Sequence, residues 1–339
     1  MRLPAARGPL TAQLFDHWLH DQPLSAGVEI SNPLVDDDLH LALWCCYELH
    51  YRGFHGLGDE LEWDLGTLAF RASLERSFEA ALRIEHAADP MPTDPRTALL
   101  ALADRAGPPL ASFVDGHGTL DHLREMSVHR SAYQLKEADP HTWGIPRLHG
   151  PARSAMIEIQ VDEYGQGVPG RAHAEIFAAA MDELGLDASF GSYVDRLPGT
   201  TLATDNLVSL FGLHRRLRGA LVGHLALFEM CSVVPMSKYR KAAVRLGPLP
   251  ALQEFYDVHV EADEHHGRIA LDDMVAGLLA TEPDLAADVI FGAAALGRVE
   301  ARFAGAVLDA WEAGRSSLRG GGLPSDGLAV DPAAMALSA

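Results

Sequence analysis

Apolar residues recur at helical spacing along most of the chain from Leu34 onward. The pattern predicts helices over residues 36–51, 63–84, 97–106, 120–138, 151–164, 171–184, 205–233 and 282–314, the last with a candidate break at Gly292. One more helix is predicted after Pro248 and Pro250. Alternating strand patterns are scarce. The predicted fold class is therefore all-α, a packed bundle of roughly eight to ten helices.

The two ends of the chain lack this periodicity. Residues 1–30 are mixed, with prolines at positions 4, 9 and 23, and are expected to form an N-terminal extension. Residues 31–315 carry the helical pattern and are expected to form the bundle domain. Residues 316–339 are rich in glycine, serine, proline and alanine, a composition typical of a flexible tail.

Composition limits the classes of protein that fit. The chain has 339 residues, of which 48% are hydrophobic and 22% charged, which indicates a soluble globular protein with a large core. Its net charge of −20 disfavours nucleic acid and anionic membranes as partners. No signal peptide and no unbroken apolar run of about 18 residues is visible. The three cysteines show no metal or disulfide spacing, so reduced thiols in the cytoplasm are expected.

The stretch HVEADEHHGR, residues 259–268, divides its polar residues between two faces of the predicted helix. At about 100° per residue, His259, Asp263 and His266 lie within roughly 40° of one line, on an apolar stripe. The opposite face carries Glu254, Asp257, Glu261, Glu264, His265 and Arg268. Burying three ionisable groups is costly unless they are paired. The stripe therefore predicts either a metal site or a hydrogen-bonded triad without metal.

Other inward-facing polar residues lie upstream. Glu163 and His173 both fall on core stripes, on either side of the helix-breaking segment GQGVPG, so that both could approach one point. The alternative is that Glu163 caps the break and His173 is an ordinary core histidine. Glu137 lies near the end of its predicted helix, where the periodicity is weaker. Arg147 and Arg153 are candidates for binding a substrate carboxylate.

The order Glu137, Glu163 in DEYG, His173 and then HxxxDxxH at 259–266 resembles the haem-oxygenase-like dimetal oxidases and oxygenases. These are the iron-containing redox enzymes of bacterial specialised metabolism. The stretches CYELHYRGF, KEADPHTWGIPRL and LFGLHRRLRGALVGHL are also similar, and the resemblance covers residues from about 30 to 315. Motifs of competing classes, Glu-x-x-His pairs, HExxH and nucleotide-binding glycine loops, are absent from the sequence.

The resemblance implies a haem-oxygenase-like helical bundle with two Fe(II) ions and O2 as co-substrate. The implied ligands, which are also the catalytic residues, are Glu137, Glu163, His173, His259, Asp263 and His266. The implied activity is oxidation of an N–H or C–H bond in a small amino acid or amine, by N-oxygenation, desaturation or cyclisation, in natural-product biosynthesis. The alternatives are a metal-independent enzyme of the same fold, thiaminase-like or a cofactorless oxidase, and a non-enzymatic metal-binding module. The expected partners are a small-molecule substrate and, as a candidate, a second copy of the chain.

Overall fold

The computed structural model describes residues 1–25 and 30–323. Within these ranges the chain is helical and contains no strand. The all-α prediction is therefore confirmed. The helices are α1 (Pro9–His20), α2 (Asp37–Glu48), α3 (Leu65–Ala88), α4 (Pro95–Ala103), α5 (Leu110–His117), α6 (Leu120–Gln134), α7 (Asp139–Thr142), α8 (Gly150–Glu163), α9 (His173–Glu183), α10 (Gly199–Leu213), α11 (Arg218–Leu246), α12 (Pro250–Arg268), α13 (Ala276–Thr281) and α14 (Ala286–Glu312).

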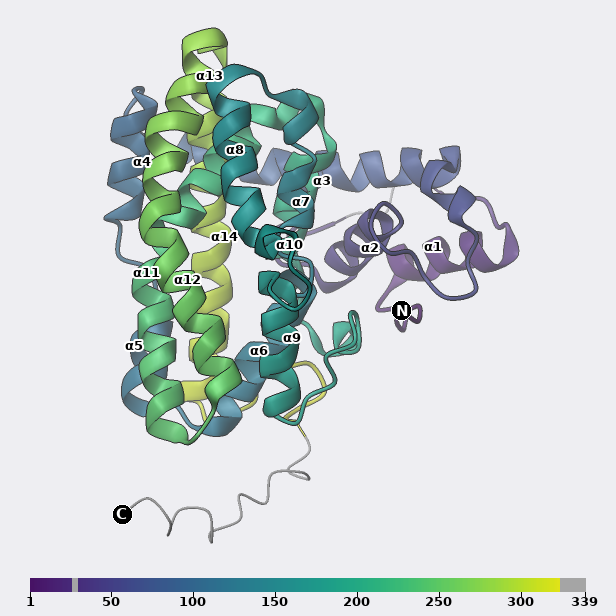
Figure 1. Ribbon diagram of the computed structural model, residues 1–339. Coiled ribbons are helices and arrows are strands. Elements are labelled where there is room, and N and C mark those ends of the chain that lie inside the picture. The colour runs from purple at the N-terminus through teal and green to yellow at the C-terminus, as the bar shows by residue number, and fades with distance from the viewer. Residues whose placement is uncertain (26–29, 324–339) are drawn as a thin grey trace, which may run out of the picture.

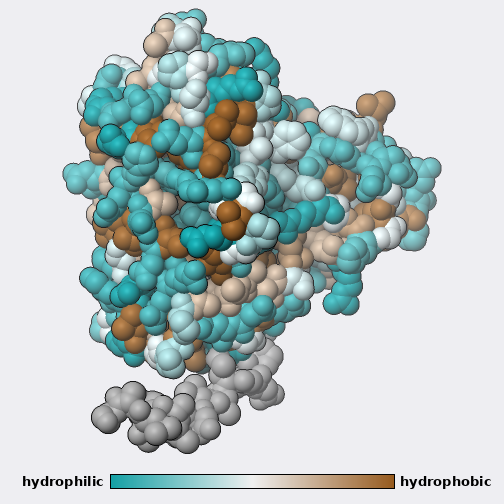
Figure 2. All heavy atoms as spheres, viewed as in Figure 1, coloured by the Kyte–Doolittle hydropathy of each residue, from teal (hydrophilic) through white to brown (hydrophobic). Residues whose placement is uncertain are grey.

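The long helices form an upright bundle with a lobe at one side (Figure 1). Helix α11 packs along both α12 and α14, and α12 also packs against α9. Helices α1, α2 and the start of α3 project sideways, and α2 joins the bundle through α10. On the face shown in Figure 2, hydrophilic residues predominate and the hydrophobic ones form scattered patches. The buried core lies between the long helices, and two of them, α11 and α12, also carry residues of the site described below.

Two glycines allow α11 and α14 to cross very closely. A Cβ atom on Gly223 would lie 1.9 Å from the carbonyl oxygen of Val289, and one on Gly292 would lie 2.0 Å from that of Ala220. No side chain fits in either place. The predicted break at Gly292 is therefore wrong: α14 runs through it, and the glycine serves the helix contact instead.

The predicted helix 205–233 is in fact two helices. Helix α10 ends at Leu213, His214 adopts an extended conformation, and α11 begins at Arg218. His214 and Arg216 turn toward α3, where they bind Glu75 and Glu79 at 2.9 Å each. The apolar pattern continues through the junction because both helices are buried, so periodicity alone could not show the break.

The ends of the chain are more ordered than their composition indicates. Residues 9–20 form α1, which packs on α2 and which the sequence pattern did not predict. At the other end, Ser317 donates hydrogen bonds from its backbone N (3.0 Å) and its Oγ (2.7 Å) to Glu125. Arg319 pairs with Asp37. The first part of the predicted flexible tail is thus attached to the bundle, whereas residues 324–339 lie outside the described residues.

Helix α11, with the short turn before it, is long and apolar enough to cross a membrane by length and composition. However, 61% of its most apolar window is buried inside the protein. This burial is what a core helix of a soluble protein shows. All three cysteines are free thiols, as expected.

Candidate metal centre

The six residues singled out in the sequence come together inside the bundle. Glu137 lies in the turn between α6 and α7, Glu163 is the last residue of α8, and His173 is the first residue of α9. The other three lie on α12. All six are at most 7% exposed. On the opposite face of α12, Glu261, Glu264 and His265 are exposed, so the predicted division of this helix into two faces is confirmed.

Four of these residues form a first cluster: Glu137, Glu163, His173 and His259. Each offers one ligand atom, and the four atoms lie within 4.8 Å of one another. His173 Nδ1 is 3.0 Å from Glu163 Oε2, and His259 Nε2 is 3.4 Å from Glu137 Oε2. The two imidazole rings are 4.4 Å apart between centroids. Two carboxylates and two imidazoles in this arrangement could hold one metal ion.

A second cluster shares Glu163 and adds Asp263, His266 and Glu229 of α11, again within 4.8 Å. His266 Nδ1 lies 3.5 Å from Glu229 Oε2, 3.8 Å from Asp263 Oδ1 and 3.9 Å from Glu163 Oε1. Glu229 is 4% exposed and was not among the predicted site residues. Its signal in the sequence was a single carboxylate inside the apolar run 220–230.

The glycine-rich turn after α8 brings Glu163 next to His173. Gly165 has a φ of +61°, and a Cβ there would lie 2.2 Å from the carbonyl carbon of Arg171. Only glycine allows the chain to fold back so tightly. The start of α9 is therefore held against the end of α8, as the break in the sequence indicated.

Two histidines are oriented by hydrogen bonds on the side away from the clusters. His259 Nδ1 donates to the carbonyl oxygen of Phe255 at 2.7 Å, which leaves Nε2 free to face Glu137. His266 Nε2 lies 3.1 Å from Asp162 Oδ2, which leaves Nδ1 for the second cluster. Such outer partners fix the tautomer and ring orientation of metal-binding histidines. The sequence placed Asp162 on an outer face, yet its half-exposed carboxylate reaches His266.

The clusters are incomplete as hydrogen-bond networks. The atoms Glu137 Oε2, Glu163 Oε2, His173 Nδ1, His259 Nε2 and His266 Nδ1 are buried and have no hydrogen-bond partner among the described residues. Buried polar atoms without partners are rare because they are costly. These five atoms face one another at short range without hydrogen-bonding geometry, which fits a set of ligands for cations better than a hydrogen-bonded triad.

The charges also favour cations. Burial, together with the nearby Glu229 carboxylate, raises the pKa of Asp263 to about 8. Burial alone would lower the pKa of His259, but the carboxylates of Glu137 and Glu163 raise it to about 10. At both residues the neighbouring buried carboxylates favour the form with the added proton, and they would favour a metal cation for the same reason. A cavity of about 10 Å³ lies between Glu137, Glu163, Glu229 and His259. Its volume is about that needed for one water-sized molecule or ion.

Arg147, a candidate for binding substrate, has a different role. Its guanidinium donates to the carbonyl oxygens of Gly212 and Leu213 and so closes the end of α10. Arg153 is exposed on α8.

An all-α bundle with buried, overlapping histidine and carboxylate clusters defines a class of metal-binding helical enzymes. The chain belongs to the family of iron-containing redox enzymes, whose sequence model matches residues 124–301, more than half of the chain. This range includes every residue of both clusters, and membership confirms the haem-oxygenase-like fold.

The chain is also similar to the nitrosourea synthase of Streptomyces achromogenes subsp. streptozoticus, with 27% identity over 152 residues. The aligned part is 44% of this chain and 32% of that enzyme, so the chain spans about a third of the relative's length.

Proposed function

We propose that this chain is a non-haem di-iron enzyme that uses O2 to oxidise an amine-bearing metabolite. The observation that carries the proposal is the pair of clusters that share Glu163. Glu137, His173 and His259 would complete one iron site. Asp263, His266 and Glu229 would complete the other. Carboxylate and imidazole donors suit Fe(II) and leave positions for O2.

The charge of the donor set supports two divalent ions. Glu137, Glu163, Glu229 and Asp263 carry four negative charges when ionised, and two divalent cations carry four positive charges. A single divalent ion would leave two carboxylates uncompensated in a buried site, which is costly. The donor set therefore fits a pair of ions better than one.

Two ferrous ions, when bound, would supply electrons for the reduction of O2 and so allow oxidation of a substrate held nearby. The chain orients its ligands for this task. The Phe255 carbonyl holds the proton of His259 on Nδ1, and Asp162 holds that of His266 on Nε2. Leu225 and Phe228 line the small cavity together with the clusters and give it an apolar side.

Oxidation at nitrogen is the favoured outcome. The name of the similar Streptomyces enzyme denotes a product with a nitroso group on a urea nitrogen, and such a product requires nitrogen oxidation. Because the similarity is partial, desaturation or cyclisation at carbon stays a second possibility for this chain. A role in natural-product biosynthesis and a cytoplasmic location belong to the same proposal.

The two alternative classes make different predictions. A metal-independent enzyme would have no use for five buried donor atoms without partners. A metal-binding module without activity would bind iron but would not consume O2 faster when substrate is added.

Oxygen uptake tests the proposal. Protein loaded anaerobically with two equivalents of Fe(II) is mixed with O2, with and without a panel of amines. We expect at least one amine to accelerate O2 uptake and to emerge oxidised. Glu163→Gln, which alters the carboxylate common to both clusters, should abolish this acceleration, whereas Glu158→Gln on the exposed face of α8 should not. Amine-dependent uptake that survives in Glu163→Gln, in protein with wild-type circular dichroism, would contradict the proposal.

A further inference from the structure

A second, much larger cavity adjoins the metal-ligand clusters. Its volume is about 650 Å³, and it lies between α6, α11, α14 and the segment that joins α4 to α5. Tyr133 and Phe228 line both this cavity and the small one at the clusters. Their rings are 5.6 Å apart between centroids, edge to face. Two aromatic side chains therefore form the boundary between the clusters and the large cavity.

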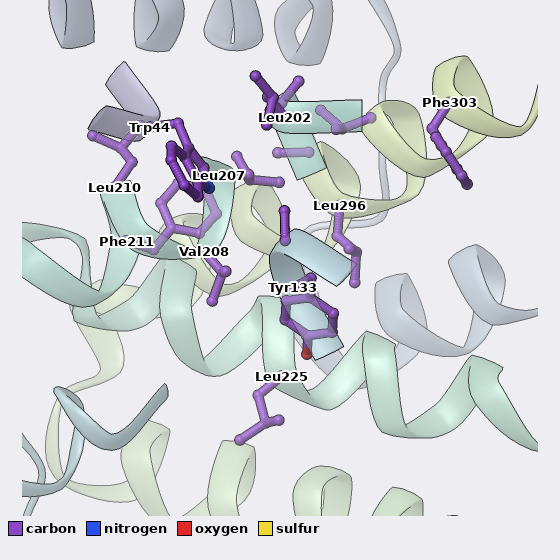
Figure 3. Packing of buried hydrophobic residues seen from close by; sticks show 14 of the residues in the cluster. Trp44, Tyr133, Leu202, Leu207, Val208, Leu210, Phe211, Leu225, Leu296 and Phe303 are labelled. Atoms are coloured by element: carbon purple, nitrogen blue, oxygen red, sulfur yellow. The ribbon is translucent and has the colours of Figure 1, made fainter. Parts of the chain in front are cut away.

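Tyr133 has an unused hydroxyl at this boundary. Its side chain is 7% exposed, and its hydroxyl makes no hydrogen bond to any residue that the structure describes. Figure 3 shows the hydroxyl directed toward α11 near Leu225, which lines the small cavity. Most buried tyrosine hydroxyls have a hydrogen-bond partner, so the Tyr133 hydroxyl is available to a ligand.

The walls of the large cavity are mainly apolar, and two of the charged residues that line it, Asp104 and Lys238, form no ion pair with any residue that the structure describes. Met126, Phe177, Leu227, Met236, Tyr256 and Leu296 provide apolar surface. Arg130 is fully engaged with Glu300 through two bonds of 2.9 and 2.7 Å. Lys238 Nζ, in contrast, contacts only the Ser112 hydroxyl (2.8 Å) among the described residues. In a chain of net charge −20, a cation left without a carboxylate on a cavity wall favours an anionic ligand group.

The distance along α11 determines which ligands could use both features. Lys238 follows Glu229 by nine residues, which corresponds to about 13 Å along a helix axis. A free α-amino acid carries its amine and carboxylate on one carbon, so it cannot reach both the clusters and Lys238. The cavity volume also lies within the range of roughly 300–1,000 Å³ that is typical of sites for drug-sized ligands.

We infer that the substrate is an elongated amphipathic amine whose carboxylate is remote from the amine, and that it binds in this cavity. The amine passes the boundary of Tyr133 and Phe228 to reach the clusters, the apolar body fills the cavity, and Lys238 binds the carboxylate. This inference rests on the proposed function, which identifies the amine as the end of the substrate that reacts. It excludes small free amino acids from the substrate class.

Calorimetric binding of a matched series of probes to the Mn(II)-loaded full chain tests the inference without turnover. The probes are 11-aminoundecanoate, undecylamine and L-leucine. We expect 11-aminoundecanoate to bind at one per chain, undecylamine about tenfold more weakly because it lacks the carboxylate, and L-leucine at least a hundredfold more weakly. Tighter binding of L-leucine, or no binding of either long probe, would overturn the inference.

Substitutions of residues that line the cavity test whether the long probes bind there. Lys238→Met should weaken 11-aminoundecanoate about tenfold and leave undecylamine unchanged, whereas Lys241→Met, exposed on the same helix, should change neither. Gly297→Leu should weaken both long probes at least tenfold. Gly297 lines the cavity, and its Cβ would meet only Leu227 Cδ2, at 3.8 Å. Wild-type binding of the long probes by folded Gly297→Leu would refute the assignment. If Gly297→Leu does not fold, the comparison of Lys238→Met with Lys241→Met still tests the assignment. Equal binding of 11-aminoundecanoate by these two variants would refute it.

The two proposals fail in distinguishable ways. If the iron-loaded protein consumes O2 with a small amino acid and the long probes do not bind, the inference is wrong and the proposed function stands. If the long probes bind as expected but no amine accelerates O2 uptake, the cavity assignment stands and the proposed function is wrong.

Discussion

Replacing Glu229 by glutamine tests the residue that the structure adds to the predicted site. The substitution keeps the size of the side chain but removes one negative charge from the second cluster. Four carboxylates then become three, so two divalent cations would leave an uncompensated positive charge in a buried site. We expect the first ion to bind nearly as in the wild type, because Glu137, Glu163, His173 and His259 are unchanged.

A comparison with Asp162 gives a lower bound for how much Glu229→Gln weakens binding of the second ion. Asp162 touches His266 from outside, and loss of such an outer partner typically weakens metal binding about 10–100-fold. Glu229 offers an oxygen to the cluster itself, so its loss should weaken the second ion by at least about 100-fold, or about 2.7 kcal/mol. Asp162→Asn should therefore weaken binding of the second ion less than Glu229→Gln does. Glu264→Gln, exposed on α12, removes a charge outside the site and is the control.

Isothermal titration of metal-free protein with Mn(II), which avoids oxidation, measures both binding steps. We expect two steps in the wild type and in Glu264→Gln, a weakened second step in Asp162→Asn, and a second step that is lost or at least about 100-fold weaker in Glu229→Gln. Two steps of wild-type affinity in Glu229→Gln would refute the assignment of Glu229 to the metal centre.

Three further predictions concern the scaffold. Residues 250–275 should exchange amide hydrogens faster without metal than with Mn(II), because the cations supply partners for the buried donors of α12; equal protection would show that the helix is preorganised. Burial lowers the pKa of His129 to about 3, so below pH 6.5 the unfolded chain takes up a proton that the folded chain does not. Between pH 6.5 and 3, His129 should therefore lower the free energy of unfolding by about 1.4 kcal/mol for each unit that the pH falls. In His129→Gln, the free energy of unfolding measured with urea should depend less steeply on pH by that amount. An unchanged pH dependence would mean that His129 is protonated in the folded protein. Gly292→Ala should lower stability by about 1–3 kcal/mol because α11 and α14 must separate, whereas Gly297→Ala on the same helix should be neutral or stabilising; equal melting temperatures in these two variants would contradict the close crossing.

Helical periodicity predicted the face of α12 because each turn of that helix has one buried and one exposed side. The angle between residues then places His259, Asp263 and His266 together, and the structure confirms their burial. The same argument placed Glu163 and His173 inward, and the glycines between them indicated that the chain could fold back there. Glu137 depended on the resemblance, since the turn that holds it has no helical period.

Helical periodicity predicted site residues and helix ends less well where a helix is buried on every side. The first half of α11 is apolar nearly all round, so Glu229 had no polar face from which it could be distinguished. The junction at His214 was missed for the same reason, and Gly292 was taken for a break because only its neighbour across the crossing explains it. The contact of Asp162 with His266 joins residues more than 100 positions apart in the chain, so no local pattern could reveal it.

The number of irons bound per chain tests the central claim most directly. Full-length protein is equilibrated anaerobically with excess ⁵⁷Fe(II), unbound iron is removed, and bound iron is counted and examined by Mössbauer spectroscopy. Because the structure brings together two clusters that share Glu163, we expect two ferrous ions per chain, and one or fewer in Glu163→Gln. Saturation of the wild type at one iron or none, or full loading of the Glu163→Gln variant, would contradict the di-iron account.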